Sequence, residues 1–328
     1  MNSAASLSER LMQGDRTALA RMITWAENAD PRFARELSAV WSRVGRAWRI
    51  GITGPPGAGK STLVNEAARL LRKSEKTVGI VAVDPSSPFT GGALLGDRIR
   101  MDDRTLDPGV FIRSMASRGS HGGLSRASAS ACDVLDAFGF DFVLLETVGV
   151  GQAEYDVLDA ADTVVVVLCP GAGDSIQAMK AGLLEVADVL VVNKSDQPGA
   201  DRLINDLVEA THVRFLKREW KVPVVAASAG TQFGVDAVLG AVEQHRAHLV
   251  ERGLEAARRE KRVEQVRHAV SEGLGEALWG RGGVRERVSA DLADGASPHA
   301  ISAALLSELL ASVQTLRAGA ARPTEPKP

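Results

Sequence analysis

The sequence is poor in aromatic residues, in cysteine and in long apolar runs. Phe, Trp and Tyr make up 4% of the 328 residues, so the core must be built from Val, Leu, Ile and Ala. Cys132 and Cys169 form no CxxC pair and no disulfide framework, which suits a reducing compartment. The longest apolar runs, around 163–168 and 189–192, fall far below the roughly 20 residues of a membrane span.

Neither sign of charge dominates the chain. Lys and Arg number 39 against 41 Asp and Glu, a net charge of -2, so the overall basic excess that favours a nucleic-acid backbone is missing. The first residues show neither a charged segment before an apolar block nor an Arg-rich leader. We therefore expect a cytoplasmic protein whose partners include no nucleic acid and no membrane.

Short apolar runs alternate with helical patterns between residues 49 and 233. Several of the runs are almost continuous in Val, Ile and Leu, as in strands that are buried on both faces. This alternation predicts an α/β domain with a doubly wound, mostly parallel sheet of about seven strands. The expected strands are 49–53, 78–84, 110–114, 140–146, 163–169, 189–193 and 222–226, and the expected helices are 61–73, 124–138, 174–182 and 200–220.

Helical extensions are expected on both sides of this domain. Residues 1–48 are expected to form two short helices, and residues 234–318 form a charged helical region. Residues 319–328 contain three prolines and are expected to be a flexible tail. One apolar stripe in the C-terminal region recurs every three or four residues, at Val263, Val266, Val270, Leu274 and Leu278.

A glycine-rich motif lies between the first expected strand and the next helix. Residues 54–61, GPPGAGKS, match GxxxxGK[ST] in the strand–loop–helix context that the motif requires. Backbone N–H groups and the helix N-terminus would hold phosphates, with Lys60 at the β- and γ-phosphates and Ser61 on Mg²⁺. The nucleotide-binding residues expected here are Gly54, Pro55, Pro56, Gly57, Ala58, Gly59, Lys60, Ser61 and Thr62.

A second motif indicates which base is bound. Residues 193–196, NKSD, directly follow an expected strand and match the NKxD signature of GTPases. The Asp196 carboxylate can accept hydrogen bonds from guanine N1–H and the exocyclic amine. Adenine offers no such pair of donors and would leave the carboxylate unpaired. The expected guanine-binding residues are Asn193, Lys194, Asp196, Ser228 and Ala229.

Three carboxylates are candidates for metal binding or for orienting the attacking water. Asp84 and Glu146 end expected strands, and Asp97 lies in a loop rich in Pro and Gly. Glu146 stands where most GTPases have the Asp of a DxxG motif, and Gly149 of that motif is expected at the γ-phosphate. The alternative for each carboxylate is a helix cap or a solvated loop acid.

Slow intrinsic hydrolysis, raised by a partner, is expected. Ras-like enzymes place a water-orienting Gln directly after DxxG, but Val150 holds that position here and Gln152 lies two residues further on. Segments 86–100, 148–155 and 171–182 follow strand ends and contain glycines, so contacts to the γ-phosphate could order them as switches.

Taken together, these residues resemble the MeaB/ArgK/MMAA family of P-loop GTPases. The resemblance spans the whole central domain and rests on residues 54–61, 83–88 (VDPSSP), 91–98 (GGALLGDR), 146–152 (ETVGVGQ), 173–177 (GDSIQ) and 193–196. It implies a GTPase domain at 49–233. It also implies a GTP-hydrolysing chaperone of adenosylcobalamin-dependent methylmalonyl-CoA mutase that gates cofactor loading and protects or reactivates the mutase.

The resemblance also implies a homodimer held by the C-terminal helices, residues 234–318. The stripe at 263–278 would contribute to it, and the alternative for that stripe is packing within one chain. The carboxylates Asp84, Asp97 and Glu146 would lie near the metal. The residues that would signal to the mutase through the switches are Gln152, Asp174, Gln177 and Lys180.

Two other functions stay open. A nickel-type maturation GTPase would need thiolate or imidazole ligands, yet the cysteines are isolated and the six histidines include no tight pair. An ATP-dependent kinase linked to amino-acid transport is the second alternative, against which residues 193–196 argue. A related cobalamin-dependent mutase is an alternative client.

Overall fold

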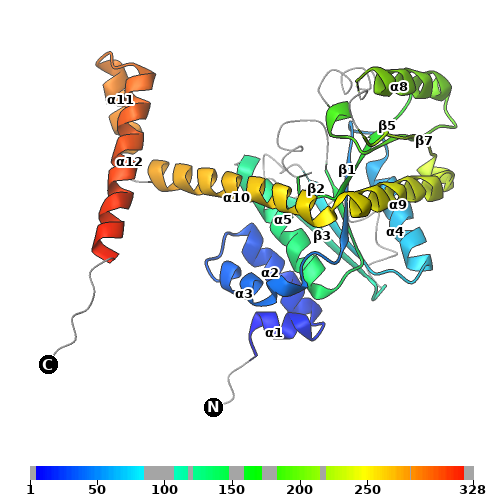
Figure 1. Cartoon of the computed structure of the whole chain (residues 1–328), viewed down its shortest axis with the longest axis horizontal. Helices are drawn as coiled ribbons and strands as arrows, with labels where there is room; N and C mark the ends of the chain where they lie inside the picture. Colours follow the sequence, from blue (N-terminus) through cyan, green and yellow to red (C-terminus); the bar gives the residue numbers. More distant parts are fainter. Residues whose placement is uncertain are drawn as a thin grey trace. The chain divides into compact units, whose positions relative to one another are not determined.

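A seven-stranded parallel sheet runs through the domain that was expected at residues 49–233 (Figure 1). The computed structural model describes residues 5–84, 107–116, 121–147, 159–171, 183–214, 219–280 and 282–320. The strands run in the order β3-β2-β4-β1-β5-β6-β7. Their bounds are β1 (Trp48–Thr53), β2 (Val78–Asp84), β3 (Val110–Ala116), β4 (Phe142–Glu146), β5 (Thr163–Leu168), β6 (Val189–Val192) and β7 (Val224–Ala226).

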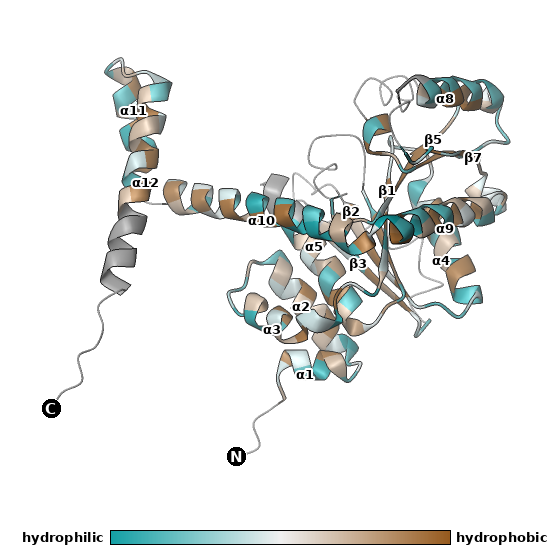
Figure 2. Cartoon of the chain, in the orientation of Figure 1, coloured by the Kyte–Doolittle hydropathy of each residue, from teal (hydrophilic) through white to brown (hydrophobic). Residues whose placement is uncertain are grey.

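The predicted fold class is confirmed, and each expected strand ends within two residues of its observed bounds. Helices cover both faces of the sheet, and its strands are coloured mainly apolar in Figure 2. One hydrophobic cluster joins β1 to α4 (Lys60–Lys73) and α9 (Val235–Arg252). The opposite face packs against α5 (His121–Phe138) and α8 (Ala200–Arg214). The single-turn 3₁₀-helix η3 (Leu183–Val186) precedes β6.

In its described residues, 5–48, the N-terminal extension has three α-helices rather than the two expected. They are α1 (Leu7–Met12), α2 (Arg16–Glu27) and α3 (Phe33–Val40), followed by the 3₁₀-helix η1 (Trp41–Arg43). The prediction was wrong because Gly14, with φ of 81°, and Asp15 interrupt the apolar pattern. Asp15 Oδ1 accepts the backbone N–H of Thr17 at 2.8 Å, which caps a new helix.

The chain divides into two compact units, residues 1–265 and 266–328. Within the helical region expected at 234–318, Gly253 (φ of 100°) separates α9 from α10 (Leu254–Trp279). In the second unit, α11 (Val284–Ala293) and α12 (Pro298–Ala320) pack through a small apolar cluster that includes Val284 and Ile301. The helix expected at 174–182 lies outside the described residues, and the predicted domain boundaries stay predictions.

Within the described residues, none of the helices combines the length and the apolar character that crossing a membrane demands.

A buried hydrogen-bonded chain ties α9 to the sheet. Trp48 Nε1 donates to Thr163 Oγ1 at 3.1 Å, and that oxygen lies 2.9 Å from His245 Nδ1. His245 Nε2 faces Asp188 Oδ1 at 3.6 Å. Burial lowers the pKa of His245 below its ordinary value, although Asp188 opposes the shift. The folded protein therefore holds His245 neutral in a pH range where the unfolded chain binds a proton.

This arrangement predicts acid-sensitive stability. Because the unfolded state binds more protons, the free energy of unfolding falls as pH drops below about 6.5, the ordinary pKa of histidine. Urea titrations at pH 7.5 and 5.5 should show a larger loss for the wild type than for His245→Gln. The exposed His212→Gln control should behave like the wild type. Equal losses for the wild type and His245→Gln would contradict the assignment.

Candidate nucleotide-binding site

Three loops at the carboxyl edge of the sheet are joined by one buried side chain. Asn193 follows β6 and is 2% exposed. Its Nδ2 donates to the carbonyl of Ala58 at 2.8 Å, in the loop after β1. Its Oδ1 accepts the backbone N–H of Ala229 at 3.0 Å, after β7. Motifs that lie about 135 residues apart in the chain are therefore held as one unit.

Two of the three glycines in the loop after β1 lie so close to neighbouring atoms that a Cβ would not fit. A Cβ on Gly54 (φ of 142°) would lie 2.0 Å from the carbonyl oxygen of Val167 in β5. A Cβ on Gly59 (φ of 88°) would lie 2.3 Å from Asn193 Nδ2. Gly57 (φ of 76°) has nothing within 4 Å of that position. The two outer glycines are thus packed against β5 and Asn193, and only Pro56 and Gly57 between them are exposed.

Lys60 opens α4 directly after this loop. Its side chain is buried, and Nζ donates to the carbonyls of Gly54 at 2.8 Å and Pro55 at 3.1 Å. The ammonium group therefore lies over the loop, at the positive end of the helix dipole. Pro56 and Thr62 are exposed beside it. The eight-residue motif therefore forms the loop between β1 and α4 that the sequence indicates, and its role in binding phosphate stays a prediction.

Ser61 and Glu146 form an oxygen pair at the same edge. Ser61 Oγ donates to Glu146 Oε1 at 2.6 Å, and Glu146 is 5% exposed at the end of β4. No group of three or more His, Cys, Asp or Glu suited to a metal ion occurs in the part of the chain that the structure describes. This donor set fits Mg²⁺, which takes one or two protein oxygens and completes its shell with phosphates and water.

Asp196 and Ser228 are joined by hydrogen bonds. The Ser228 hydroxyl donates to Asp196 Oδ1, and Asp196 N donates to Ser228 Oγ at 3.2 Å. The hydroxyl bond is the main cause that lowers the pKa of Asp196 below its ordinary value. Because Asp196 is also exposed, its carboxylate is ionised and open to a ligand at neutral pH. Lys194 beside it has a φ of 56°, backbone strain of the kind that gathers at functional sites.

Several expected site residues lie wholly or partly outside the described part of the chain. Asp84 is the last residue of β2, next to β4 in the sheet, but its side chain is not among those described. The expected residues that lie outside the described ranges are Asp97, Gly149, Gln152, Asp174, Gln177 and Lys180. Their roles stay predictions.

Two hydroxyl groups beneath the site were missed by the sequence analysis. Thr147 Oγ1 donates to Thr53 Oγ1 at 2.9 Å, and both side chains are buried. Thr53 is the last residue of β1 and Thr147 directly follows β4, so threonine at adjacent strand ends was the available signal. The Val167 carbonyl against Gly54 has no sequence signal, because every residue carries a carbonyl group.

The chain is similar in sequence and in fold to several known proteins. The family described as methylmalonyl Co-A mutase-associated GTPase MeaB matches residues 19–282. A putative GTPase of Pyrococcus horikoshii is 47% identical over 277 residues, covering 84% of this chain and 87% of the relative. The GTPase ArgK of Escherichia coli is 37% identical over 284 residues, covering 83% and 86%. A crystal structure titled LAO/AO transport system kinase superposes with a TM-score of 0.71 and 28% identity, over 95% of this chain and 100% of that one.

The packing of Gly59 against Asn193 can be tested by stability. Gly59→Ala and Gly57→Ala both place a Cβ at a left-handed position, at a cost of about 1–2 kcal/mol. Only the Cβ of Gly59→Ala also collides with the Asn193 amide. Urea denaturation should therefore show a larger loss in the free energy of unfolding for Gly59→Ala than for Gly57→Ala. In an Asn193→Ala background the two substitutions should become equally costly. Strict additivity of Gly59→Ala and Asn193→Ala would contradict the contact.

Proposed function

Because the chain belongs to the family of methylmalonyl-CoA mutase-associated GTPases represented by MeaB, we propose that it binds GTP with Mg²⁺ and hydrolyses it to GDP and phosphate. In this proposal, it acts as a chaperone of an adenosylcobalamin-dependent methylmalonyl-CoA mutase and couples its nucleotide state to cofactor loading and to protection or reactivation of the mutase. The observation that carries the nucleotide part is the Asn193 bridge between the phosphate loop and the base-binding loops.

The phosphate side of the proposal assigns roles to residues already close together. The backbone of residues 54–59, with Lys60 and Thr62, would hold the phosphates. Ser61 and Glu146 would hold Mg²⁺, and their 2.6 Å contact supports this. The metal would offset negative charge on the phosphate oxygens. The residues proposed to complete the metal and γ-phosphate contacts are Asp84, Asp97 and Gly149.

The base side of the proposal rests on an exposed, ionised Asp196. Ser228 donates to one carboxylate oxygen and so fixes its orientation toward the base. Lys194 would cover the base plane, and the backbone of Ala229 would meet the guanine carbonyl. Asn193 would hold the phosphate-binding loop and the base-binding loops in fixed positions relative to each other. These residues favour guanine over adenine, because adenine would leave the Asp196 carboxylate without hydrogen-bond donors.

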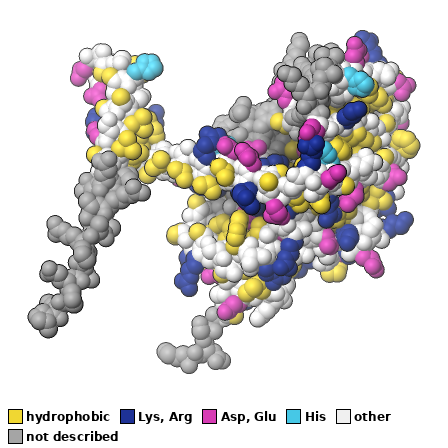
Figure 3. Space-filling model, viewed as in Figure 1, with side chains coloured by type: hydrophobic (Ala, Val, Ile, Leu, Met, Phe, Trp, Pro, Cys, Tyr) yellow, Lys and Arg dark blue, Asp and Glu magenta, His cyan; other side chains and the backbone are white. Residues whose placement is uncertain are grey.

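The partner assignments rest on exposed apolar surface as well as on the family. Figure 3 shows hydrophobic side chains gathered along α10. Val263, Val266, Val270 and Leu274 are between 44% and 63% exposed on that helix. Such a row on a helix is typical of a protein interface, and a second copy of the chain is the proposed occupant. The residues proposed to signal to the mutase are Gln152, Asp174, Gln177 and Lys180.

The rival functions have less support. Both cysteines are buried, and the described residues hold no cluster suited to a soft metal, which disfavours metal delivery. An adenosine triphosphate-dependent kinase would leave Asp196 without its donors.

Replacing Asp196 by Asn tests the base assignment. An amide can no longer accept two hydrogen bonds, but its N–H₂ can donate to the 2-carbonyl of xanthine. We expect Asp196→Asn to bind GDP at least tenfold more weakly and xanthosine diphosphate more tightly than the wild type does, in competition titrations. The matched control Asp201→Asn, on α8, should leave both affinities unchanged. Unchanged GDP affinity in Asp196→Asn would remove this residue from the site.

Complex formation tests the partner assignment. We expect the protein to co-elute with methylmalonyl-CoA mutase in size-exclusion chromatography, with different yields in GDP and in a non-hydrolysable GTP analogue. Asp196→Asn should lose this dependence on guanine nucleotide. If a complex forms only with a related cobalamin-dependent mutase, that mutase is the client in place of methylmalonyl-CoA mutase. If the protein forms a complex with neither mutase, the chaperone role is contradicted.

A further inference from the structure

Six charged side chains meet at the edge of the sheet where β1 and β5 begin, opposite the nucleotide-binding loops. Three are carboxylates that are at most 6% exposed. Three are guanidinium groups, two of which come from α10. This base cluster consists of Arg49, Asp133, Asp136, Asp162, Arg258 and Arg262.

The contacts within the base cluster are close. Arg49 Nη2 lies 2.8 Å from both Asp133 Oδ1 and Asp136 Oδ2. Arg262 reaches the same Asp133, with Nη1 3.0 Å from Oδ2. Arg258 Nε and Nη2 donate to the two oxygens of Asp162 at 2.8 and 2.7 Å. The three positive charges balance the three negative ones.

Two of the three cations therefore belong to α10. If this helix were detached, Arg49 alone would face three carboxylates in the protein interior. Burial by itself would lower the pKa of Arg49, but Asp133 and Asp136 outweigh it and raise the pKa above its usual value. Buried carboxylates without a cation are strongly unfavourable. Attachment of α10 is thus set by electrostatic balance as well as by packing.

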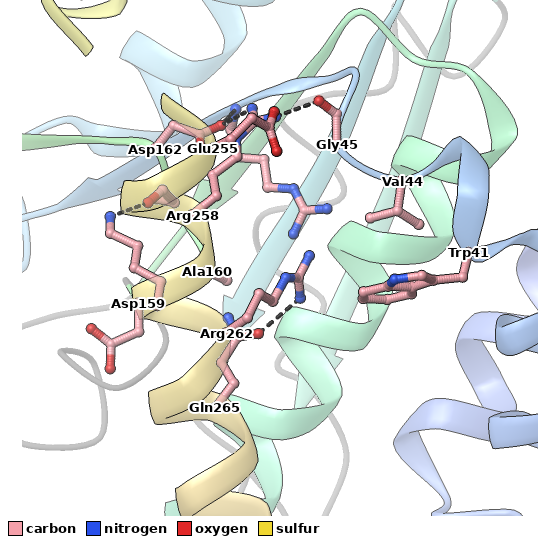
Figure 4. A pocket seen from close by; sticks show the side chains of 13 residues that line it. Trp41, Val44, Gly45, Asp159, Ala160, Asp162, Glu255, Arg258, Arg262 and Gln265 are labelled. Carbon is pink, nitrogen blue, oxygen red and sulfur yellow. Dashed lines mark hydrogen bonds and ion pairs between the residues drawn. The ribbon is translucent and has the colours of Figure 1, made fainter. Parts of the chain in front are cut away.

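A cleft of about 190 Å³ lies beside the base cluster, and Figure 4 shows Arg258 and Arg262 pointing into it from α10. Its cations are already engaged with protein atoms. Arg262 stacks 5.1 Å from the Trp41 ring centre, and Lys261 Nζ donates to the Ala161 carbonyl at 2.5 Å. The cleft therefore marks the seam along which α10 is attached, and its guanidinium groups act on the protein itself.

Arg258 links the starts of two particular strands. It donates to the carbonyls of Gly45 and Ala47, just before β1. It also binds Asp162, just before β5, whose Oδ2 accepts the Arg49 N–H at 2.9 Å. One side chain of α10 therefore contacts the segments just before both β1 and β5, in addition to the hydrogen bonds that pair the two strands.

The same two strands meet again at the phosphate loop. They pair in parallel from Ile50 opposite Thr163 to Thr53 opposite Val166. One residue further on, the Cβ position of Gly54 lies only 2.0 Å from the Val167 carbonyl oxygen. A small shift between β1 and β5 would change this contact directly, because close-packed interiors transmit displacement.

We propose that Arg258 and Arg262 make α10 an ionic latch on the base cluster, whose attachment is energetically coupled to guanine nucleotide binding at the other end of β1 and β5. This inference rests on the proposed function, because it needs a nucleotide in the phosphate loop. Coupling is reciprocal. Nucleotide binding therefore strengthens the attachment of α10 by the same factor by which that attachment strengthens nucleotide binding.

The test compares two variants on the same helix. Arg258→Met/Arg262→Met removes both latch cations and keeps the side-chain length. Arg259→Met removes an exposed cation between them. By calorimetry, we expect the latch variant to bind GDP about tenfold more weakly than the wild type, within the usual range of coupling. Arg259→Met should stay within about twofold of the wild type, since it keeps every contact of the base cluster.

Hydrogen exchange supplies the reciprocal measurement. In the wild type, GDP should slow amide exchange in residues 254–265, and in the latch variant it should not. If circular dichroism shows the double variant to be unfolded, Arg262→Gln replaces it, because Asp133 then keeps Arg49. A loss of GDP affinity of about threefold is expected for that variant.

The outcomes separate the latch from the proposed function. Equal GDP affinities in the wild type and the latch variant, or exchange in residues 254–265 that GDP does not alter, would overturn the latch alone. A folded wild type that binds no GDP would overturn the proposed function and the latch with it.

Discussion

The nucleotide-binding edge depends on the hydrogen bonds of one amide, the side chain of Asn193. Its two ends bind the loops after β1 and β7, while its own backbone follows β6. A parallel sheet brings its carboxyl ends to one edge but does not fix the loops there. The Asn193 amide joins three of these loops, together with the bonds between Asp196 and Ser228. Its closeness to Gly59 leaves no room for a Cβ there. The need for glycine at position 59 and the position of Asn193 thus arise from the same contact between two motifs.

The two ends of β1 differ in their electrostatics. At its carboxyl end, Lys60 and the helix dipole gather positive potential over an open loop that is suited to phosphates. At its amino end, Arg49 lies among carboxylates and further guanidinium groups with no net charge left over. The first arrangement is suited to a charged ligand. The second joins the amino end of this strand to α5 through buried ion pairs.

The motifs and strands were predictable because their signals are local. Continuous Val and Ile runs fixed the strands to within two residues, and residues 54–61 and 193–196 carry the site chemistry within a few positions. The N-terminal helices were miscounted because Gly14 and Asp15 interrupt a pattern that otherwise continues through both helices. The base cluster could not be found this way. Arg49, Asp133 and Arg258 lie far apart in the chain, and no periodicity links them.

The central claim is that the loops after β1, β6 and β7 form a single site for a guanine nucleotide. Calorimetric titration of the wild-type protein with GDP and with ADP, in the presence of Mg²⁺, tests it most directly. The account predicts saturable binding of one GDP per chain and no measurable heat with ADP. Equal binding of both nucleotides, or heat from neither with folded protein, would contradict it.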